Sequence, residues 1–142
     1  MNMRDRGLTF LFVVAVLVGG CTTHAPEVDV RTPLPKGTDP LIYVTSARQK
    51  ERVIGALNAA GFHLVDAPAD GVYLLRVTVG IDQGSRPCGT LNNVRLSLRR
   101  QEKSIVEAEA KGWTGSCQPN VFDDVSRALR ARIVDMTDGG HA

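Results

Sequence analysis

Three segments of the chain alternate apolar and polar residues one by one, and this pattern constrains the fold more than any other feature. They are Tyr73–Ile81, Val94–Arg99 and Ile105–Trp113. A period of two is typical of a strand with one buried and one wet face. If Leu98 faces Val106 across a turn at residues 101–104, then Arg95 faces Glu109, and opposite charges meet on the wet face.

Two segments with helical periodicity flank these strands. Ser46 and Gln49 have the spacing of a capping box, so we expect a helix over Ala47–Ala60. Asn120 is placed to cap a second helix. The apolar stripe of that helix consists of Phe122, Val125, Leu129, Ile133 and Met136.

Two short β-rich segments complete the pattern, Leu41–Thr45 before the first helix and Phe62–Val65 after it. The order β-α-β-β-β-β-α predicts the α+β class, as a two-layer sandwich in which both helices cover one face of an antiparallel sheet of about four to five strands. We expect one domain over residues 41–138, followed by a disordered tail at 139–142.

The N-terminus has the pattern of an export signal. Arg4 and Arg6 precede the apolar run Leu8–Val18, whose eleven residues are too few to cross a bilayer, which needs about 20. Small residues and a cysteine follow, in the order Val18-Gly19-Gly20-Cys21. Residues 1–20 are therefore predicted to be a signal peptide.

The sequence Val18-Gly19-Gly20-Cys21 resembles the lipobox of bacterial lipoproteins. The resemblance implies that the Cys21 thiol receives a diacylglycerol, that the leader is removed, and that the new amine is acylated, for example with palmitate. Thr22, in place of an aspartate, implies the outer membrane, with the domain facing the periplasm. An ordinary secretory leader with a chance cysteine is the alternative.

Residues 21–40 are predicted to be the lipidated cysteine and a proline-rich tether. Pro26, Pro33, Pro35 and Pro40 leave no apolar periodicity in this segment. In polyproline conformation, at about 3.1 Å per residue, such a tether would reach up to ~60 Å from the lipid. A disordered spacer whose reach has no function is an equal alternative.

The other two cysteines, Cys88 and Cys117, form an even pair in a chain that we expect in an oxidising compartment. We therefore predict a disulfide between them. A redox or metal pair is the weaker alternative, because there is no Cys-Xaa-Xaa-Cys spacing and no histidine nearby.

The order of elements over Leu41 to Met136, with its Leu75-Arg76-Val77-Thr78-Val79 strand, resembles small domains of periplasmic assembly lipoproteins of the curli-secretion and penicillin-binding-protein-activator type. This chain departs from those families in being shorter and in having the cysteine pair. The resemblance implies an accessory role in an envelope complex.

No catalytic chemistry is indicated. The three histidines, His24, His63 and His141, are scattered, and no nucleotide-binding, metalloprotease or hydrolase motif is present. The net charge of +2 is spread along the chain, which excludes a nucleic-acid footprint. We expect no cofactor, no metal and no enzymatic activity.

Two surfaces are candidates for interaction. The first is a rim tied by the disulfide, with Arg86 and Trp113, although the packing of Trp113 against the disulfide and helix ends is the favoured interpretation of that residue. The second is the row Arg95, Arg99 and Arg100, which would suit an acidic partner or lipid headgroups unless Glu107 and Glu109 neutralise it.

The predicted function is an accessory module, lipid-anchored and non-enzymatic, that binds an envelope protein. The alternative is a periplasmic binding protein for a small ligand or glycan, with a pocket between sheet and helices. Aromatic residues, which would line such a pocket, make up only 5% of the chain, and this low content favours the accessory module.

Overall fold

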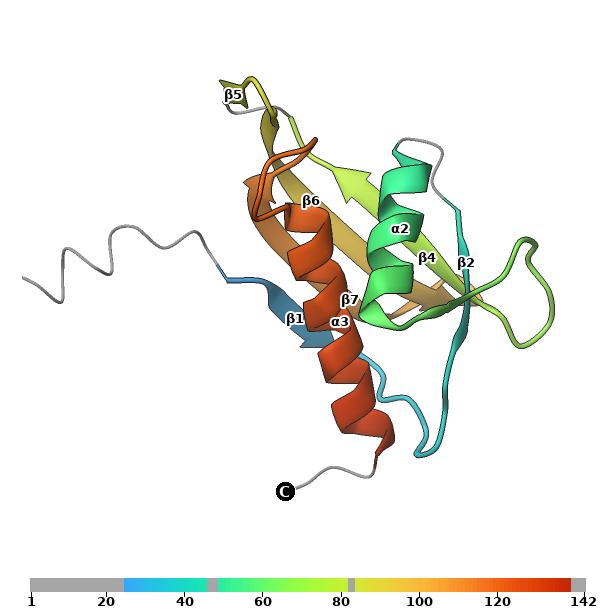
Figure 1. The fold of residues 1–142 in the computed structure, drawn as a ribbon. Helices are drawn as coiled ribbons and strands as arrows, with labels where there is room; N and C mark the ends of the chain where they lie inside the picture. Colours follow the sequence, from blue (N-terminus) through green and yellow to red (C-terminus); the bar gives the residue numbers. More distant parts are fainter. Residues whose placement is uncertain (1–24, 46–48, 82–83, 139–142) are drawn as a thin grey trace, which may run out of the picture.

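A computed structural model describes residues 25–45, 49–81 and 84–138. The predicted signal peptide, Cys21, Thr22, Ser46 and the tail at 139–142 lie outside these residues. Within them, one open seven-stranded sheet carries two helices on one face, α2 (Lys50–Ala60) and α3 (Val121–Thr137) (Figure 1). The strands are β1 (Glu27–Val30), β2 (Leu41–Val44), β3 (His63–Leu64), β4 (Tyr73–Val79), β5 (Ser85–Arg86), β6 (Gly89–Arg100) and β7 (Lys103–Trp113).

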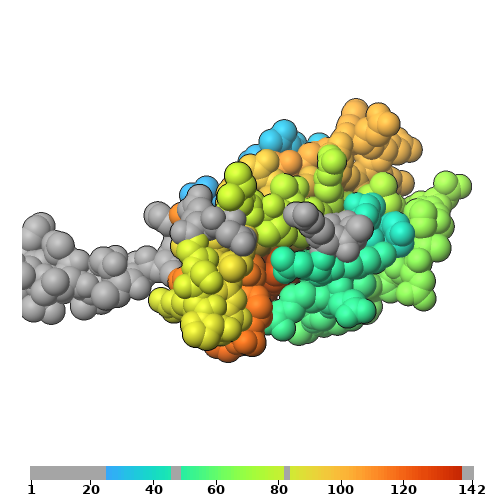
Figure 2. All heavy atoms as spheres, turned by 90° about the horizontal axis from the view of Figure 1, so that it is seen from above, coloured from blue at the N-terminus to red at the C-terminus, as the bar shows by residue number. Residues whose placement is uncertain are grey.

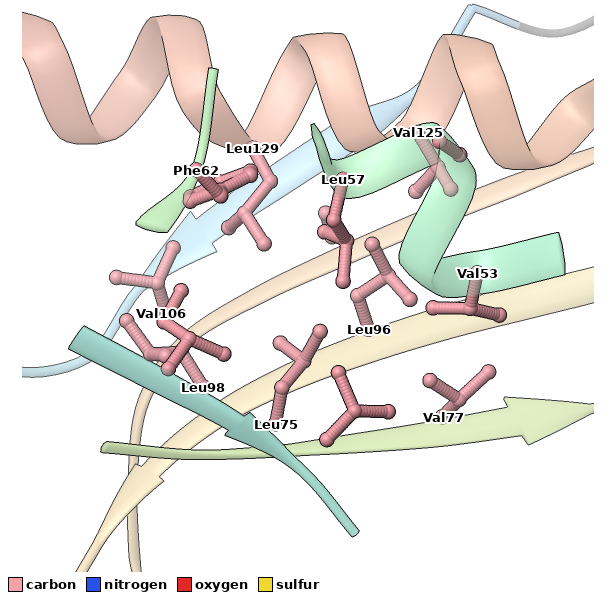
Figure 3. Packing of buried hydrophobic residues seen from close by; sticks show 14 of the residues in the cluster. Val53, Leu57, Phe62, Leu75, Val77, Leu96, Leu98, Val106, Val125 and Leu129 are labelled. Carbon is pink, nitrogen blue, oxygen red and sulfur yellow. The ribbon is translucent and has the colours of Figure 1, made fainter. Parts of the chain in front are cut away.

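The core lies between the helices and the inner face of the sheet. Alternate residues of the strands and one stripe of each helix fill it, as their periodicity predicts. Figure 3 shows these side chains pointing toward one another from both layers. Its central members are Val53 and Leu57 of α2, Leu75 of β4, Leu96 and Leu98 of β6, Val106 of β7, and Val125 and Leu129 of α3.

The register of the β6–β7 hairpin is the one that the alternation predicts. Leu98 pairs with Val106, and Arg95 pairs with Glu109. The inner positions are buried, so the charged residues Arg95, Glu107 and Glu109 fall on the opposite face, which the helices leave open. The prediction of this hairpin is confirmed.

The sheet is larger than predicted and it is mixed. Its order is β1-β7-β6-β4-β2-β3, with β5 paired to β6, and β2 is parallel to both β3 and β4. The parallel pairs arise because α2 carries the chain back to the starting edge between β2 and β3. An antiparallel sandwich of four to five strands therefore matches the architecture only roughly.

Residues 27–40, which the sequence assigns to the tether, are part of the folded domain. Their strand β1 runs antiparallel to β7, with Val28 opposite Ala108. Leu34 is only 5% exposed, and Gly37 donates its N–H to the carbonyl oxygen of Thr137 at 2.8 Å. The prolines lie outside β1, with Pro26 before it and Pro33 after it, so all four residues of the strand keep the backbone N–H groups that pairing needs.

The first helix also differs from its prediction, because α2 begins at Lys50 rather than Ala47. Gln49 has a left-handed backbone, with a φ of 54°, and makes no side-chain capping bond. The second helix agrees better: the side chain of Asn120 accepts a hydrogen bond from the Phe122 N–H at 2.9 Å. That cap is the one predicted.

The hairpin between β6 and β7 closes with two residues in left-handed conformation. Gln101 and Glu102 have φ values of 49° and 66°, the geometry of a turn that favours Asn-Gly. A Glu102→Gly variant is expected to raise the free energy of unfolding by about 0.5–1 kcal/mol, because glycine adopts positive φ without steric cost. Thermal unfolding measures this, with Glu102→Ala as the matched control that loses the same carboxylate but keeps a Cβ. Equal melting temperatures for the two variants would contradict the prediction.

Candidate functional site

One end of the sheet is closed by the disulfide between Cys88 and Cys117. We call this end the rim and define it as residues 84–91 and 113–120. In Figure 2, which looks onto the end where β5 lies, the yellow segment that contains β5 rests against the orange segment that follows β7. The Cα atoms of the two cysteines are 4.8 Å apart, within the ordinary range of disulfides. The predicted pairing is confirmed.

Trp113 ends β7 at the rim and is half-buried. The guanidinium carbon of Arg86 lies 4.1 Å from the centroid of its ring, which is a cation–π contact. The two rim residues singled out from the sequence therefore touch. Stacking leaves the charge of Arg86 at the surface beside a large amphipathic ring.

A buried polar network holds the two halves of the rim together. The Oδ1 atom of Asn92, a residue only 2% exposed, accepts hydrogen bonds from Thr90 Oγ1 at 2.7 Å and Thr114 Oγ1 at 3.0 Å. Its Nδ2 donates to the Gly80 carbonyl at 3.0 Å. Satisfied buried networks of this kind rigidify the segments that they join. The end of β4 is thus tied to the same point.

Both helices are attached to the rim through Gly115. Its carbonyl oxygen accepts hydrogen bonds from Asn120 Nδ2 at 2.8 Å and from the guanidinium of Arg52 on α2. Because Asn120 also caps α3, one side chain joins the helix terminus to the rim. The rim is therefore a rigid platform.

The open face of the sheet carries charged side chains that are partly paired. Arg95 Nη2 lies 3.1 Å from Glu109 Oε2, as the register predicts. Hydrogen bonds from Asn93 and then Arg95 hold the pKa of Glu109 below its usual value, and the bond to Glu109 raises the pKa of Arg95. Glu107 pairs with Arg31 at 3.1 Å. Both carboxylates are thus neutralised by neighbours.

Two arginines on this face have no carboxylate partner among the described residues. They are Arg76 of β4 and Arg99 of β6, and Arg99 donates only to the backbone carbonyl of Glu102, at 2.8 Å. Both line one shallow hollow of about 390 Å³. Thr45, Leu74 and Val77 complete its lining.

The predicted row of arginines is thus divided by the structure. Arg95 forms an ion pair with Glu109, whereas Arg99 has no carboxylate partner among the described residues. Arg100 does not line the hollow, and its guanidinium carbon lies 5.3 Å from the centroid of the Tyr73 ring. Sequence analysis missed Arg76 as a candidate. The alternation of β4 puts Arg76 on the wet face, but only the register of β4 with β6 shows that it shares a hollow with Arg99.

A second hollow, of about 240 Å³, lies between α2 and the edge of the sheet. Its polar lining includes Tyr43, Lys50, Asn58 and Asp66. Within residues 25–45, 49–81 and 84–138 no three histidine, cysteine or acidic residues gather as metal ligands. In that same part of the chain, no helix has the length and apolar character needed to span a bilayer.

No family model matches the chain, and no curated protein matches it either. Among solved structures it is similar to a PelC dodecamer from Paraburkholderia phytofirmans, at 14% identity and a TM-score of 0.44, over 79% of this chain and 98% of that one. A point variant of that dodecamer gives 14% and 0.44, over 82% and 99%. A minor lipoprotein from Acinetobacter baumannii is 16% identical with a TM-score of 0.33, over 68% of this chain and 91% of that one. None of the three carries a conclusion about what this chain binds.

Proposed function

We propose that this chain is a lipid-anchored, non-enzymatic accessory protein of the bacterial envelope, whose open sheet face binds an acidic surface of another envelope protein. The observation that carries the proposal is the hollow lined by Arg76 and Arg99, two arginines without a carboxylate partner among the described residues. Guanidinium groups bind carboxylates in bidentate fashion, so such a pair suits acidic side chains.

The surroundings of the hollow support a protein partner. Leu74, which pairs with Arg99, contributes apolar surface to the hollow, and Arg31 and Arg95 on the same face are already paired with acids. A partner that supplies carboxylates would therefore bind at the hollow, where the guanidinium groups of Arg76 and Arg99 have no carboxylate partner among the described residues. Interfaces commonly combine charged groups at the edge with apolar contact at the centre.

The proposed anchor comes from the N-terminal residues. The sequence Val18-Gly19-Gly20-Cys21 supports lipidation on Cys21, and Thr22 supports the outer membrane, with the domain in the periplasm. At about 0.8 kcal/mol for each buried methylene, two or three acyl chains hold a protein stably on a bilayer.

The alternative function is binding of a small ligand or glycan, and the second hollow is its candidate site. There Tyr43, Lys50, Asn58 and Asp66 offer a mixture of donors and acceptors beside α2. Binding there would be independent of Arg76 and Arg99, so one set of variants separates the two functions.

The test is crosslinking and affinity capture of the lipidated protein in its native cells. A double Arg76→Glu/Arg99→Glu variant is expected to recover about tenfold less of its partner, because carboxylates then face carboxylates. Arg132→Glu is the control, since Arg132 is exposed on α3, on the other side of the molecule. A Cys21→Ala variant tests the anchor separately. Equal capture by both charge variants would reject the hollow as the binding site.

A further inference from the structure

The segment between Cys21 and the folded domain is much shorter than the twenty-residue tether expected from the sequence. Strand β1 starts at Glu27 and is paired to β7 from that residue onward. Only residues 22–26 separate it from Cys21, and the six Cα–Cα steps from Cys21 to Glu27 span at most about 20 Å. A lipid on Cys21 would therefore hold the domain against the membrane surface.

The place where the chain enters the domain decides which part faces the membrane. Pro26 lines a small hollow together with Lys111, Trp113 and Pro119. The attachment point thus lies beside the rim.

Three side chains at this end favour a bilayer interface, and the acidic Asp124, which lines the same hollow, is paired with Arg127 at 2.6 Å. Trp113 is amphipathic, and Arg86 stacks on its ring. Tryptophan is enriched at the headgroup level of membranes, and arginine and lysine bind lipid phosphates. Ile81, which follows β4 at the same end, is 88% exposed. A large exposed aliphatic side chain is costly in water but favourable in a lipid interface.

We propose that the rim docks on the phospholipid bilayer that holds the anchor, with Trp113 at headgroup level and with Arg86 and the adjoining Lys111, just outside the rim, on lipid phosphates. This inference rests on the proposed lipidation of Cys21. Arg99 lies nine positions along β6 from Thr90 at the rim, which corresponds to about 30 Å. The arginine hollow then lies on the side away from the lipid, where a periplasmic partner has access.

Trp113 provides the test, because it is the only tryptophan of the chain. The chain from Cys21 onward is coupled through the Cys21 thiol to maleimide lipids in phospholipid vesicles, with Cys88 and Cys117 kept as the disulfide. Lipids brominated near the headgroup are expected to quench Trp113 emission about twofold. The emission maximum of Trp113 should also shift to shorter wavelength when vesicles are present. An Arg86→Ala/Lys111→Ala variant is expected to lose most of this quenching, whereas the matched Arg76→Ala/Arg99→Ala variant keeps it.

Two results would overturn the inference. One is unquenched emission, identical to that of the chain without vesicles, although flotation shows complete coupling. The other is that a photocrosslinker at Arg86 labels a protein rather than lipid in native membranes. Because the vesicle experiment supplies the anchor chemically, failure of lipidation is detected independently, by the mass of the N-terminal peptide from cells.

Discussion

We expect a Cys88→Ala/Cys117→Ala variant to lose about 3.6 kcal/mol of unfolding free energy. The two cysteines are 29 residues apart, and in the chain-entropy model a loop of that length confers this much stability by restricting the unfolded chain. For a domain of this size, the melting temperature should fall on the order of 15 °C. Urea unfolding, followed by circular dichroism, measures the free energy directly.

Because of its position, the disulfide should stabilise the rim against local opening as well as the whole domain against unfolding. It joins the open end of the β6–β7 hairpin, where the Ser116 N–H donates to the Cys88 carbonyl at 2.7 Å. Without the covalent link, amide hydrogen exchange at Ser116 should accelerate more than exchange at Val106, in the middle of β7.

Reduction of the parent protein provides the matched control for this variant. A reductant should lower the stability of the parent by a similar amount and leave the alanine variant unchanged. An unfolding free energy of the variant within about 0.5 kcal/mol of the parent would show that the hairpin alone holds the rim.

The features that could be predicted from sequence are those fixed by neighbours along the chain. Alternation in β6 and β7 determined which side chains face the core, and one assumed pair, Leu98 with Val106, was enough to place Arg95 opposite Glu109. The Asn120 cap depends only on the next two residues. Local propensity and local pairing agree at these positions.

The features that could not be predicted depend on contacts between distant segments. Strand β1 has only Val28 and Val30 to face the core, and it is a strand because β7 offers a free edge. The hollow of Arg76 and Arg99 requires the register of β4 against β6, which no single segment encodes. The shortness of the segment between Cys21 and the domain also depends on a distant contact, because it results from the pairing of β1 with β7. The proposed orientation on the membrane rests on this short segment.

The two proposed surfaces fit one arrangement of the molecule. The rim would face the bilayer in the proposed arrangement, and the arginine hollow lies toward the far end of β4 and β6. The rigid sheet between them fixes the height of the hollow above the lipid, so a partner would be held at a set distance from the membrane. A long flexible tether would not impose such a distance.

We expect Gly89→Ala to destabilise the domain by about 3 kcal/mol, because the rim leaves no room for a side chain there. A Cβ at Gly89 would overlap the carbonyl group of Thr114. To relieve the overlap, the two segments must separate, which breaks the bond from the Thr114 N–H to the Thr90 carbonyl, now 2.9 Å. Oxidative folding should also leave more free thiol in this variant, since the same displacement moves Cys88 away from Cys117.

Gly55→Ala is the matched control for this substitution. Gly55 lies in α2 with nothing near its would-be Cβ, so alanine there should stabilise the helix by about 0.5–1 kcal/mol. A double-mutant cycle then tests the cause: in the Cys88→Ala/Cys117→Ala background, Gly89→Ala should cost less, because the unlinked rim can open to admit the methyl group. The same cost in both backgrounds would mean that the close approach of the two backbones, rather than the disulfide, holds the rim closed.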